Sequence, residues 1–539
     1  MNWKHYKALS PKEKQKETFY IVGLDLGNET SGIAFYNLHE NAPEPIDLSG
    51  GYGKPSIPTV MQYIPETKEW VFGEYAILNQ GSGMEITIDS IVQRLGRFDY
   101  IEIDHKTVSI ASILGIFIKE LLGSVRNINP RAEIVGIVAA IQDQLSPEAQ
   151  DELKRAFKHA GYEKELIALV PSRECVLAHH YSSFHPSINE KLLLIDYGSR
   201  GVRGGVYEIK NNAAQSDNRL EASEMGASGS KQIAVKALSN LFDEEIGNSK
   251  ILADVHGLFE AQVHTATHNH SLLHEQLPSN LCQQITAFTY QHKDILFQKN
   301  IRSKPVKIYY NFVYPPFQHT IAFSDINRLI NPHNDRFCRF LVSAIKKTVG
   351  ADVLNPQSMD SVICTGGGFE MLWAKESVTS MFGISKFSMF KNPKLVAAEG
   401  AALVAANLLG VVAGYSFNIE DTHQLPGDIG IRLGDVFLPL SLRNAYWWQA
   451  HQPMLVLVNS KVSGELGLSI SERTQSGDER ILAAPTLTGL PKRPKGTTRL
   501  KFDVDFKSDT RMTLQVSDLG FGELFPASSY RQEFNVQRA

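Results

Sequence analysis

The sequence predicts a two-lobed α/β domain followed by an all-β domain. Two apolar, strand-like runs end in Asp-x-Gly, at Asp25 and at Asp196, and a second strand-like run follows each turn. A third turn, Gly366-Gly367-Gly368, joins a strand-like run to a helix-like segment. After about residue 410, helical patterns give way to short strand-like runs. Three glycine turns in one long region indicate a cleft between two lobes.

The first turn has the elements of a phosphate-binding hairpin. Asp25-Leu26-Gly27 ends an apolar run, and the strand-like run 32–36 follows it. Because Gly27 has no Cβ, backbone N–H groups of the turn can approach a phosphate closely. The carboxylate of Asp25 would then lie near a phosphate-bound metal ion. One such hairpin is a weak signal by itself, since many hairpins contain Asp and Gly.

The pattern recurs in the second half of the α/β region. The run 192–195 ends in Asp196-Tyr197-Gly198, and a further strand-like run covers 204–209. The triple glycine turn follows the strand-like run 361–363 and opens a helix-like segment over 369–380. Two Asp-x-Gly hairpins and one strand–glycine–helix junction could enclose a nucleotide between two lobes.

In this order, the three turns resemble the phosphate-1, phosphate-2 and adenosine motifs of the actin-like ATPase superfamily. More narrowly, the chain resembles the heat shock protein 70 chaperone family, from about residue 20 to about residue 529. The segments that carry this resemblance are 54–60, 71–76, 94–97, 391–393 and 396–402. The resemblance implies an actin-like ATPase domain with two lobes of ribonuclease-H-like subdomains, followed by an all-β sandwich.

Composition limits the classes of partner. A net charge of −4 offers no electrostatic basis for binding nucleic acid or an anionic membrane. The four cysteines are far apart and lack metal-ligand spacing, which favours reduced thiols in a cytosolic protein. The lysine-rich start has no apolar core of a signal peptide, and no apolar run reaches about 18 residues. We therefore expect a cytoplasmic protein without nucleic-acid or membrane partners.

The domain organisation follows from the motifs and from the change in composition. The expected parts are a mobile tail (1–18), a nucleotide-binding domain (19–410) with lobe I (19–190) and lobe II (191–410), a linker (411–427) and a β-sandwich (428–539). The last part resembles the peptide-binding domain of the chaperones, without the helical lid that normally follows it. Because 419–421 carries two acids, we expect the linker to dock more weakly than the apolar linker of the family.

The resemblance implies ATP or ADP with Mg²⁺ in the cleft. It implies catalytic roles for Asp25, Asp196 and Glu174, with Asp25 and Asp196 also holding Mg²⁺ through water. The implied cofactor-binding residues are Gly27, Asn28, Glu29, Gly198, Ser199, Arg200, Gly366, Gly367, Gly368 and Lys293. Two of these roles have open alternatives, because Glu174 fits an ordinary helix N-terminal acid and Arg200 could point to solvent instead of a phosphate.

The departures from the family pattern lie where hydrolysis is carried out. Asn28 and Glu29 replace two threonines of the first loop, and a carboxylate at Glu29 would repel phosphates unless Mg²⁺ intervenes or the side chain turns outward. Arg203 replaces the final acid of the second loop. Gln93 aligns with the catalytic lysine and cannot supply its charge, although Arg94 could swing in. Such cations are worth several powers of ten in some phosphoryl-transfer enzymes.

The adenosine side of the cleft also departs from the pattern. On the helix expected to contact adenine, only Lys293 keeps a stem able to lie on a base, and lysine stacks less well than arginine. Lys394 stands where the family has an acid near the nucleotide.

The function expected from these features is that of a heat shock protein 70-like chaperone. ATP binding would change the affinity of the β-domain for unfolded or extended peptide, with weak or absent hydrolysis and possible co-chaperones. One alternative is a pseudo-ATPase scaffold or regulatory protein whose β-domain binds a dedicated protein partner. A sugar-kinase-like enzyme is a third possibility, disfavoured because sugar-contact residues have no visible counterpart and the β-domain has no place in it.

Overall fold

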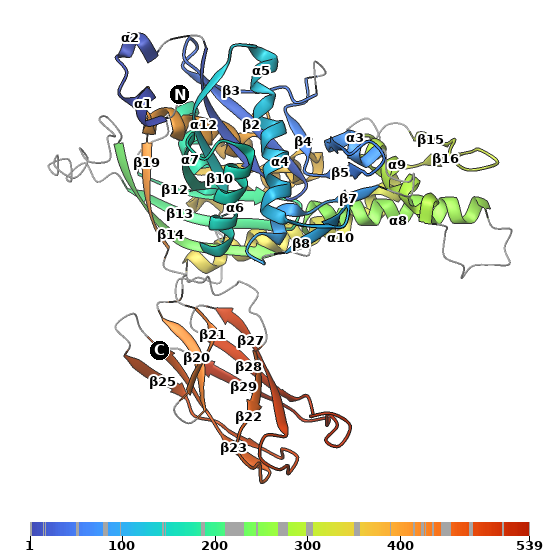
Figure 1. Cartoon of the computed structure of the whole chain (residues 1–539), viewed down its shortest axis with the longest axis vertical. Coiled ribbons are helices and arrows are strands. Elements are labelled where there is room, and N and C mark those ends of the chain that lie inside the picture. The colour runs from blue at the N-terminus through green and yellow to red at the C-terminus, as the bar shows by residue number, and fades with distance from the viewer. Residues whose placement is uncertain are drawn as a thin grey trace. The chain divides into compact units, whose positions relative to one another are not determined.

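The computed structural model places the chain in two compact units, Met1–Glu420 and Asp421–Ala539 (Figure 1). The description covers residues 3–537 with internal gaps. The gaps are 15, 17, 50–52, 79–84, 98, 143–144, 146, 185–188, 211–230, 244–245, 268–278, 298–304, 350–355, 389, 413–414, 422–424, 426, 434–435, 443–453, 474–477 and 509–510.

The first unit contains two large sheets with the same strand order. One sheet runs β11 (Leu166–Pro171), β10 (Glu133–Ile141), β1 (Phe19–Leu26), β2 (Thr30–Asn37) and β3 (Ala42–Pro45), with β4 (Ser56–Pro58) also on β2. The other runs β18 (Phe387–Ser388), β17 (Ser361–Thr365), β12 (Glu190–Tyr197), β13 (Val202–Lys210), β14 (Lys231–Asp243) and β19 (Tyr415–Asp421). In both sheets a central antiparallel hairpin has a parallel neighbour, β10 on β1 and β17 on β12. The two hairpins with Asp-x-Gly turns are therefore structurally equivalent.

Helices pack so closely on the first sheet and on each other that two of the contacts require glycine. Helix α12 (Val396–Leu408) lies against β1, where a Cβ on Gly23 would be 2.1 Å from the Ala398 carbonyl oxygen. It also lies against α7 (Ser172–Phe184), where a Cβ on Gly400 would be 1.9 Å from the Cys175 carbonyl oxygen. Larger residues at these glycines would force the helix off the sheet. Helices α4 (Ile110–Gly123) and α6 (Pro147–Ala160) contact each other and pack in a separate buried cluster with alternate residues of β1.

The second sheet carries a helical extension. Its helices are α8 (Asn248–Thr267), α9 (Ser279–Phe297), α10 (Phe323–Val349) and α11 (Leu372–Phe382), together with the hairpin β15 (Val306–Tyr310) and β16 (Phe317–Ile321). Short α3 (Gly73–Leu78) of the first lobe contacts α9 of the second, so the lobes also meet away from the sheets (Figure 1). Within the described parts of the chain, no helix is long and apolar enough to cross a membrane.

The N-terminal segment is packed, which corrects the expectation of a mobile tail over 1–18. It forms α1 (Trp3–Lys7) and α2 (Pro11–Lys14), and Tyr6 is fully buried in the core beneath. The Tyr6 hydroxyl donates to the Lys14 carbonyl oxygen at 3.1 Å, and Lys14 Nζ donates to the Leu409 carbonyl oxygen at 3.3 Å. Sequence reasoning gave weight to the lysines and overlooked the apolar residues between them.

The expected linker 411–427 is also corrected in part, because its residues Tyr415–Asp421 form edge strand β19. Tyr415 and Phe417 alternate along the strand, as in a half-buried strand, and pack against the core. Their ring centroids lie 5.4 and 5.7 Å from that of Tyr181 on α7. Strand pairing and these aromatic contacts hold the segment in the first unit. The expectation of weak docking considered the acids at 420 and 421 but not the aromatic residues before them.

The second unit is all-β, as expected. One sheet runs β21 (Val436–Ser441), β20 (Asp428–Leu433), β24 (Ser469–Arg473) and β25 (Glu479–Ala483); the other runs β22 (Met454–Val458), β27 (Thr498–Ser508), β28 (Arg511–Asp518) and β29 (Arg531–Gln537). A short pair, β23 (Glu465–Gly467) and β26 (Thr486–Thr488), completes it. Ile431 and Ile470 from the first sheet and Phe502 and Leu514 from the second share one buried core. Two sheets around one core make a sandwich.

A buried ion pair holds one end of this sandwich. Arg493 donates from both terminal nitrogens to the Asp518 carboxylate, at 2.7 and 2.8 Å, and their side chains are 5% and 0% exposed. Asp518 also accepts hydrogen bonds from the backbone N–H groups of Gly520 and Ser528. Burial raises the pKa of this carboxyl, but these four donors outweigh it and the pKa lies below its ordinary value.

Candidate functional site

The two acids of the Asp-x-Gly turns occupy equivalent places and lie near each other. Asp25 pairs with Gly32 on the antiparallel neighbour and with Ala140 on the parallel neighbour. Asp196 pairs in the same way with Arg203 and with Thr365. Burial, and to a smaller extent the nearby charge of Asp196, together raise the pKa of Asp25 from 3.8 to about 7. The structure therefore brings together the two carboxylates predicted from the sequence.

The triple glycine turn lies directly against Asp196. Gly366 has a φ of +92°, and a Cβ there would be 2.7 Å from Asp196 Oδ1 and 2.4 Å from the Tyr197 carbonyl oxygen. Its N–H donates to the Pro393 carbonyl oxygen at 2.9 Å. Only glycine fits such a position. The second and third turns therefore meet, as the sequence predicts for a cleft.

The first turn is tight and is held by a threonine that sequence reasoning did not single out. A Cβ on Gly27 would be 2.3 Å from the Thr30 carbonyl oxygen. Thr59 Oγ1 donates to the Gly27 carbonyl oxygen at 2.8 Å, and its N–H donates to the Glu29 carbonyl oxygen at 2.8 Å. Thr59 Oγ1 also lies 2.8 Å from Ser31 Oγ. Through Thr59, the segment 54–60 holds the backbone of the first turn in place by hydrogen bonds.

Asn28 provides a sign that this turn can hold a ligand. Its Oδ1 is buried and has no hydrogen-bond partner within the described part of the chain. A buried acceptor without a partner costs about 1–3 kcal/mol, so such groups are normally satisfied by water, an ion or a ligand. This orphaned acceptor beside Asp25 fits a hydrated cation or a polar ligand at the turn.

Glu29 connects the first turn to the second lobe. Asn248 Nδ2 donates to Glu29 Oε2 at 3.3 Å, and Asn248 N–H donates to the Gly198 carbonyl oxygen at 3.1 Å. The Ser199 carbonyl oxygen accepts hydrogen bonds from the N–H and the hydroxyl of Ser249, at 2.9 and 2.6 Å. The start of α8 therefore holds the second turn. Sequence reasoning missed Asn248 because no motif marks it.

Arg200 and Arg203 differ in their setting. Arg200 is exposed, which favours its solvent-facing alternative. Arg203 lies directly opposite Asp196 across β12 and β13, so both side chains leave the same face of the sheet. The strand partner of Asp196 is therefore an arginine, whereas the strand partner of Asp25 in the first lobe is Gly32.

The other two glycines of the third turn face side chains of the protein itself. A Cβ on Gly367 would be 2.9 Å from Lys394 Cε, and Lys394 Nζ pairs with Glu370 Oε2 at 2.7 Å. A Cβ on Gly368 would be 2.2 Å from the Tyr197 ring. Packing against Tyr197 accounts for glycine at 368, while Gly367 leaves room for the Lys394 stem.

The remaining predicted site residues are less well supported. Glu174 lies in the first turn of α7, the position of an ordinary helix N-terminal acid. Ser172 Oγ donates to the Ile141 carbonyl oxygen at 3.0 Å, which fixes the start of α7 at the same sheet edge as Asp25. Lys293 lies on α9, but its side chain is outside the described residues.

At the position where the sequence comparison expected a lysine, the described residues are Gln93, which is neutral, and Arg94, which is paired. Gln93 lies in a short 3-10 helix, Ile91–Arg94. Arg94 Nε donates to Asp99 Oδ2 at 3.2 Å, so the neighbouring guanidinium is already paired. The expected swing of Arg94 into the cleft would have to break this ion pair.

The carboxylate pair suits a hard cation held through water. Mg²⁺ prefers oxygen ligands and usually keeps several of its waters. Nowhere in the described residues do three or more His, Cys, Asp or Glu side chains gather as a direct metal cage. Asp25 and Asp196 together with the Asn28 acceptor fit a hydrated ion, and they would hold its waters.

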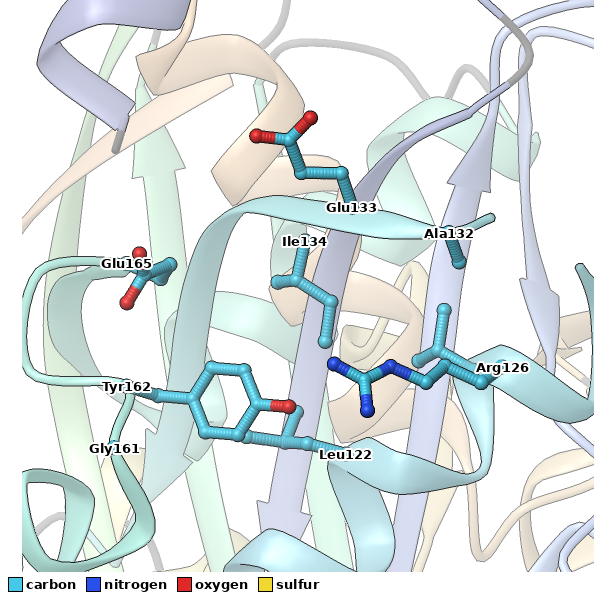
Figure 2. A pocket seen from close by; sticks show the side chains of 9 residues that line it. Leu122, Arg126, Ala132, Glu133, Ile134, Gly161, Tyr162 and Glu165 are labelled. Carbon is cyan, nitrogen blue, oxygen red and sulfur yellow. The ribbon is translucent and has the colours of Figure 1, made fainter. Parts of the chain in front are cut away.

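A separate surface cavity of about 190 Å³ lies at the amino end of β10. Figure 2 shows the Arg126 side chain directed toward the Tyr162 ring inside it. The lining residues Glu133 and Ile134 start β10 and Ala132 precedes it, whereas Asp25 is aligned with Ala140 near the end of that strand. The cavity is therefore at the opposite sheet edge from the carboxylate pair and is not part of the candidate site.

Comparison with known proteins gives one distant functional lead. Residues 42–307 match a "Family of unknown function (DUF5716) C-terminal", and residues 425–537 match a "Domain of unknown function (DUF8552)". The "Chaperone protein DnaK" of Thermosipho africanus (strain TCF52B) is 22% identical over 513 residues, which is 94% of this chain and 79% of that protein. The same values hold for the "Chaperone protein DnaK" of Thermosipho melanesiensis (strain DSM 12029 / CIP 104789 / BI429). The chain is thus distantly similar to DnaK over most of its length, and a mixed α/β unit followed by antiparallel β-sheets is consistent with a heat shock protein 70-like architecture.

Proposed function

We propose that the protein is a heat shock protein 70-like chaperone with an actin-like nucleotide-binding domain. In this proposal the first unit binds ATP or ADP with Mg²⁺, and the β-sandwich binds unfolded or extended peptide. The observation that carries the proposal is the convergence of Asp25, Asp196 and Gly366 from three separate turns. The distant similarity to DnaK over 94% of the chain supports the same assignment.

The roles of the residues follow from their chemistry. Asp25 and Asp196 would hold the waters of Mg²⁺, which when bound neutralises phosphate charge. The N–H groups around Gly27 and Gly198 would face the phosphates, and the Gly366 turn would lie beside the nucleoside. Burial keeps part of Asp25 protonated near pH 7, so cation binding and ionisation of this carboxyl favour each other.

Hydrolysis in this proposal is weak or absent. Gln93 is neutral, and the Arg94 guanidinium is engaged with Asp99. Without a cation near the γ-phosphate, the charge that develops in phosphoryl transfer is poorly stabilised. Arg203 lies opposite Asp196 in the strand register, so its positive charge would offset that of a carboxylate that hydrolysis requires.

A second candidate function is that of a pseudo-ATPase scaffold whose β-sandwich binds one dedicated protein partner. The Glu29–Asn248 contact favours it, because a carboxylate at the rim of the cleft opposes the entry of phosphates.

Calorimetric titration with ATP and with ADP, each with and without Mg²⁺, tests the proposal. We expect Mg²⁺-dependent binding that Asp196→Asn weakens at least about tenfold, equal to about 1.4 kcal/mol. The control Glu40→Gln changes an exposed acid in the turn after β2 and should leave binding unchanged. Absence of binding at millimolar nucleotide would reject the chaperone assignment.

Single-turnover hydrolysis and peptide binding separate the two candidates. Tight nucleotide binding with no phosphate release, and no effect of ATP on the affinity for an extended apolar peptide, would favour the scaffold. A peptide affinity that changes on addition of Mg²⁺-ATP would favour the chaperone, whatever the hydrolysis rate. Fluorescence anisotropy of a labelled peptide measures this directly.

A further inference from the structure

We propose that Glu29 is an internal anionic latch between the two lobes of the first unit. In this proposal its carboxylate bonds Asn248 in place of an incoming phosphate, holds the lobes together without any ligand, and must be displaced when a phosphate enters. The latch itself is independent of the proposed function, whereas the displacement step rests on nucleotide binding in the same cleft.

The contact joins the two turns that carry the site acids. On one side is Glu29, in the turn that follows Asp25. On the other is Asn248, whose N–H bonds the Gly198 carbonyl oxygen in the turn that follows Asp196. Asn248 Nδ2 donates to Glu29 Oε2 at 3.3 Å across 219 residues of sequence. A change in the spacing of the lobes must therefore stretch or break this hydrogen bond.

Both ends of the latch are held rigidly by their own lobes. The Glu29 backbone is fixed by its bond from Thr59 N–H at 2.8 Å. The Asn248 backbone follows Gly247, where a Cβ would be 2.4 Å from the Ser199 carbonyl oxygen and 2.5 Å from Gly201 N. Because neither backbone can shift easily, the side-chain bond transmits the relative position of the lobes.

The chemistry of the latch is that of a phosphate substitute. A carboxylate and a phosphate oxygen both accept from an amide N–H, so the Asn248 side chain can serve either. Glu29 also places a carboxylate in the turn that follows Asp25, bonded to the residue that holds the turn after Asp196. Phosphates that lack a cation are opposed by this charge, and phosphates that bring one must still replace the Asn248 bond.

Two kinds of substitution separate the hydrogen bond from the charge. Glu29→Gln removes the charge but keeps an oxygen that can accept from Asn248. Glu29→Ala and Asn248→Ala remove the bond from either side. Glu40→Ala, at an exposed acid of the same lobe, is the matched control.

The first test measures lobe separation by spin-label distance without nucleotide. Labels at Ile128 in the first lobe and Ile384 in the second use exposed positions, with the partly accessible Cys282 and Cys338 replaced by serine. We expect longer and broader distances in Glu29→Ala and Asn248→Ala, and wild-type distances in Glu29→Gln and Glu40→Ala. Unchanged distances in both alanine variants, with wild-type circular dichroism, would overturn the latch.

The second test measures binding of Mg²⁺-ATP by calorimetry. Glu29→Ala should bind at least about tenfold more tightly than wild type, because neither the carboxylate charge nor the bond to Asn248 then opposes the phosphates. Equal or weaker binding would refute the displacement step. If no variant binds nucleotide, the proposed function and the displacement step fail together, while the distance measurement still decides whether the latch exists.

Discussion

Asp25 shows how a site residue works against the stability of its own fold. Its pKa of about 7 in the folded chain lies well above 3.8, so the folded state holds a proton that the unfolded state has lost. Stability from this group therefore falls as pH rises from about 4 to about 7, and the full penalty remains above pH 7. A carboxylate kept under such a cost is typical of a functional site.

We predict that Asp25→Asn stabilises the first unit at pH 8. The repulsion from Asp196 and the cost of burying a charge both disappear, which is worth on the order of 2–4 kcal/mol with allowance for partial solvent contact. Denaturant unfolding at pH 8 and pH 5 measures it, with a clearly smaller gain expected at pH 5, where only part of the penalty is present. Loss of stability at pH 8 would show that the carboxylate is compensated by contacts in the fold.

His180 offers a pH prediction away from the site. The side chain is 2% exposed, and neither ring nitrogen has a hydrogen-bond partner within the described chain. Glu190 Oε1 lies 3.8 Å from Nε2. Burial, and then the charge of His179, lower the pKa of His180 from 6.5 to about 4. The neutral ring stabilises the fold above pH 6.5, and this contribution is lost as pH falls toward 4.

His180→Phe should therefore flatten the pH dependence of unfolding between pH 6.5 and pH 4. The wild type should lose on the order of 3 kcal/mol more than the variant over this range, because its ring must be charged while buried. Denaturant titrations at four pH values within the range measure the difference. Parallel pH curves for the two proteins would contradict the assignment.

Helix α1 and strand β19, from opposite ends of the first unit's sequence, pack into the same core. The core that buries Tyr6 of α1 also receives Tyr415, Phe417 and Ile419 of β19. The two segments are at opposite ends of the unit's sequence, and each lacks enough apolar surface to be stable alone. Their folded structure therefore depends on the helix–sheet core formed by the rest of the unit. Lys14 adds a hydrogen bond to the Leu409 carbonyl oxygen, just after α12.

We predict that Phe417→Ser releases β19 from the sheet edge. The substitution removes a ring that packs 5.7 Å from Tyr181 and places a hydroxyl among apolar groups. Hydrogen exchange of a peptide covering 415–421 should become at least about tenfold faster, while exchange in β12 stays slow. Lys12→Met on exposed α2 is the control, and unchanged exchange in Phe417→Ser would mean that backbone pairing alone holds the strand.

At the scale of the whole molecule, the two units have separate cores. The residues of the sandwich core all lie after Asp421, and the other buried clusters lie before it. Each unit buries enough apolar surface for its own cooperative unfolding. We therefore expect two thermal transitions.

Arg493→Met should shift only the transition of the second unit. It leaves the buried Asp518 carboxylate without its partner, which costs about 3–5 kcal/mol. Scanning calorimetry of the full chain measures both transitions at once. Equal shifts in both would show that the units unfold as one, and no shift would show that water replaces the guanidinium.

Much of the candidate site was predictable because its signals are local. An apolar run that ends in Asp-x-Gly can hardly be anything but a strand and a turn, so both hairpins and the third glycine turn are confirmed. The alternation over 500–506 similarly identified β27. The packed N-terminus and strand β19 were missed because their short apolar patterns become informative only when a distant surface accepts them.

By itself, the sequence determined the turns, the acids within them and the change from α/β to all-β structure, because glycine geometry and side-chain periodicity act between neighbours. Only the tertiary structure decided that Asp25 is buried close enough to Asp196 for its pKa to rise, that Thr59 fixes the first turn, and that Glu29 reaches Asn248. These contacts join residues far apart in sequence. Their geometry depends on how two sheets and α12 pack, which no local pattern records.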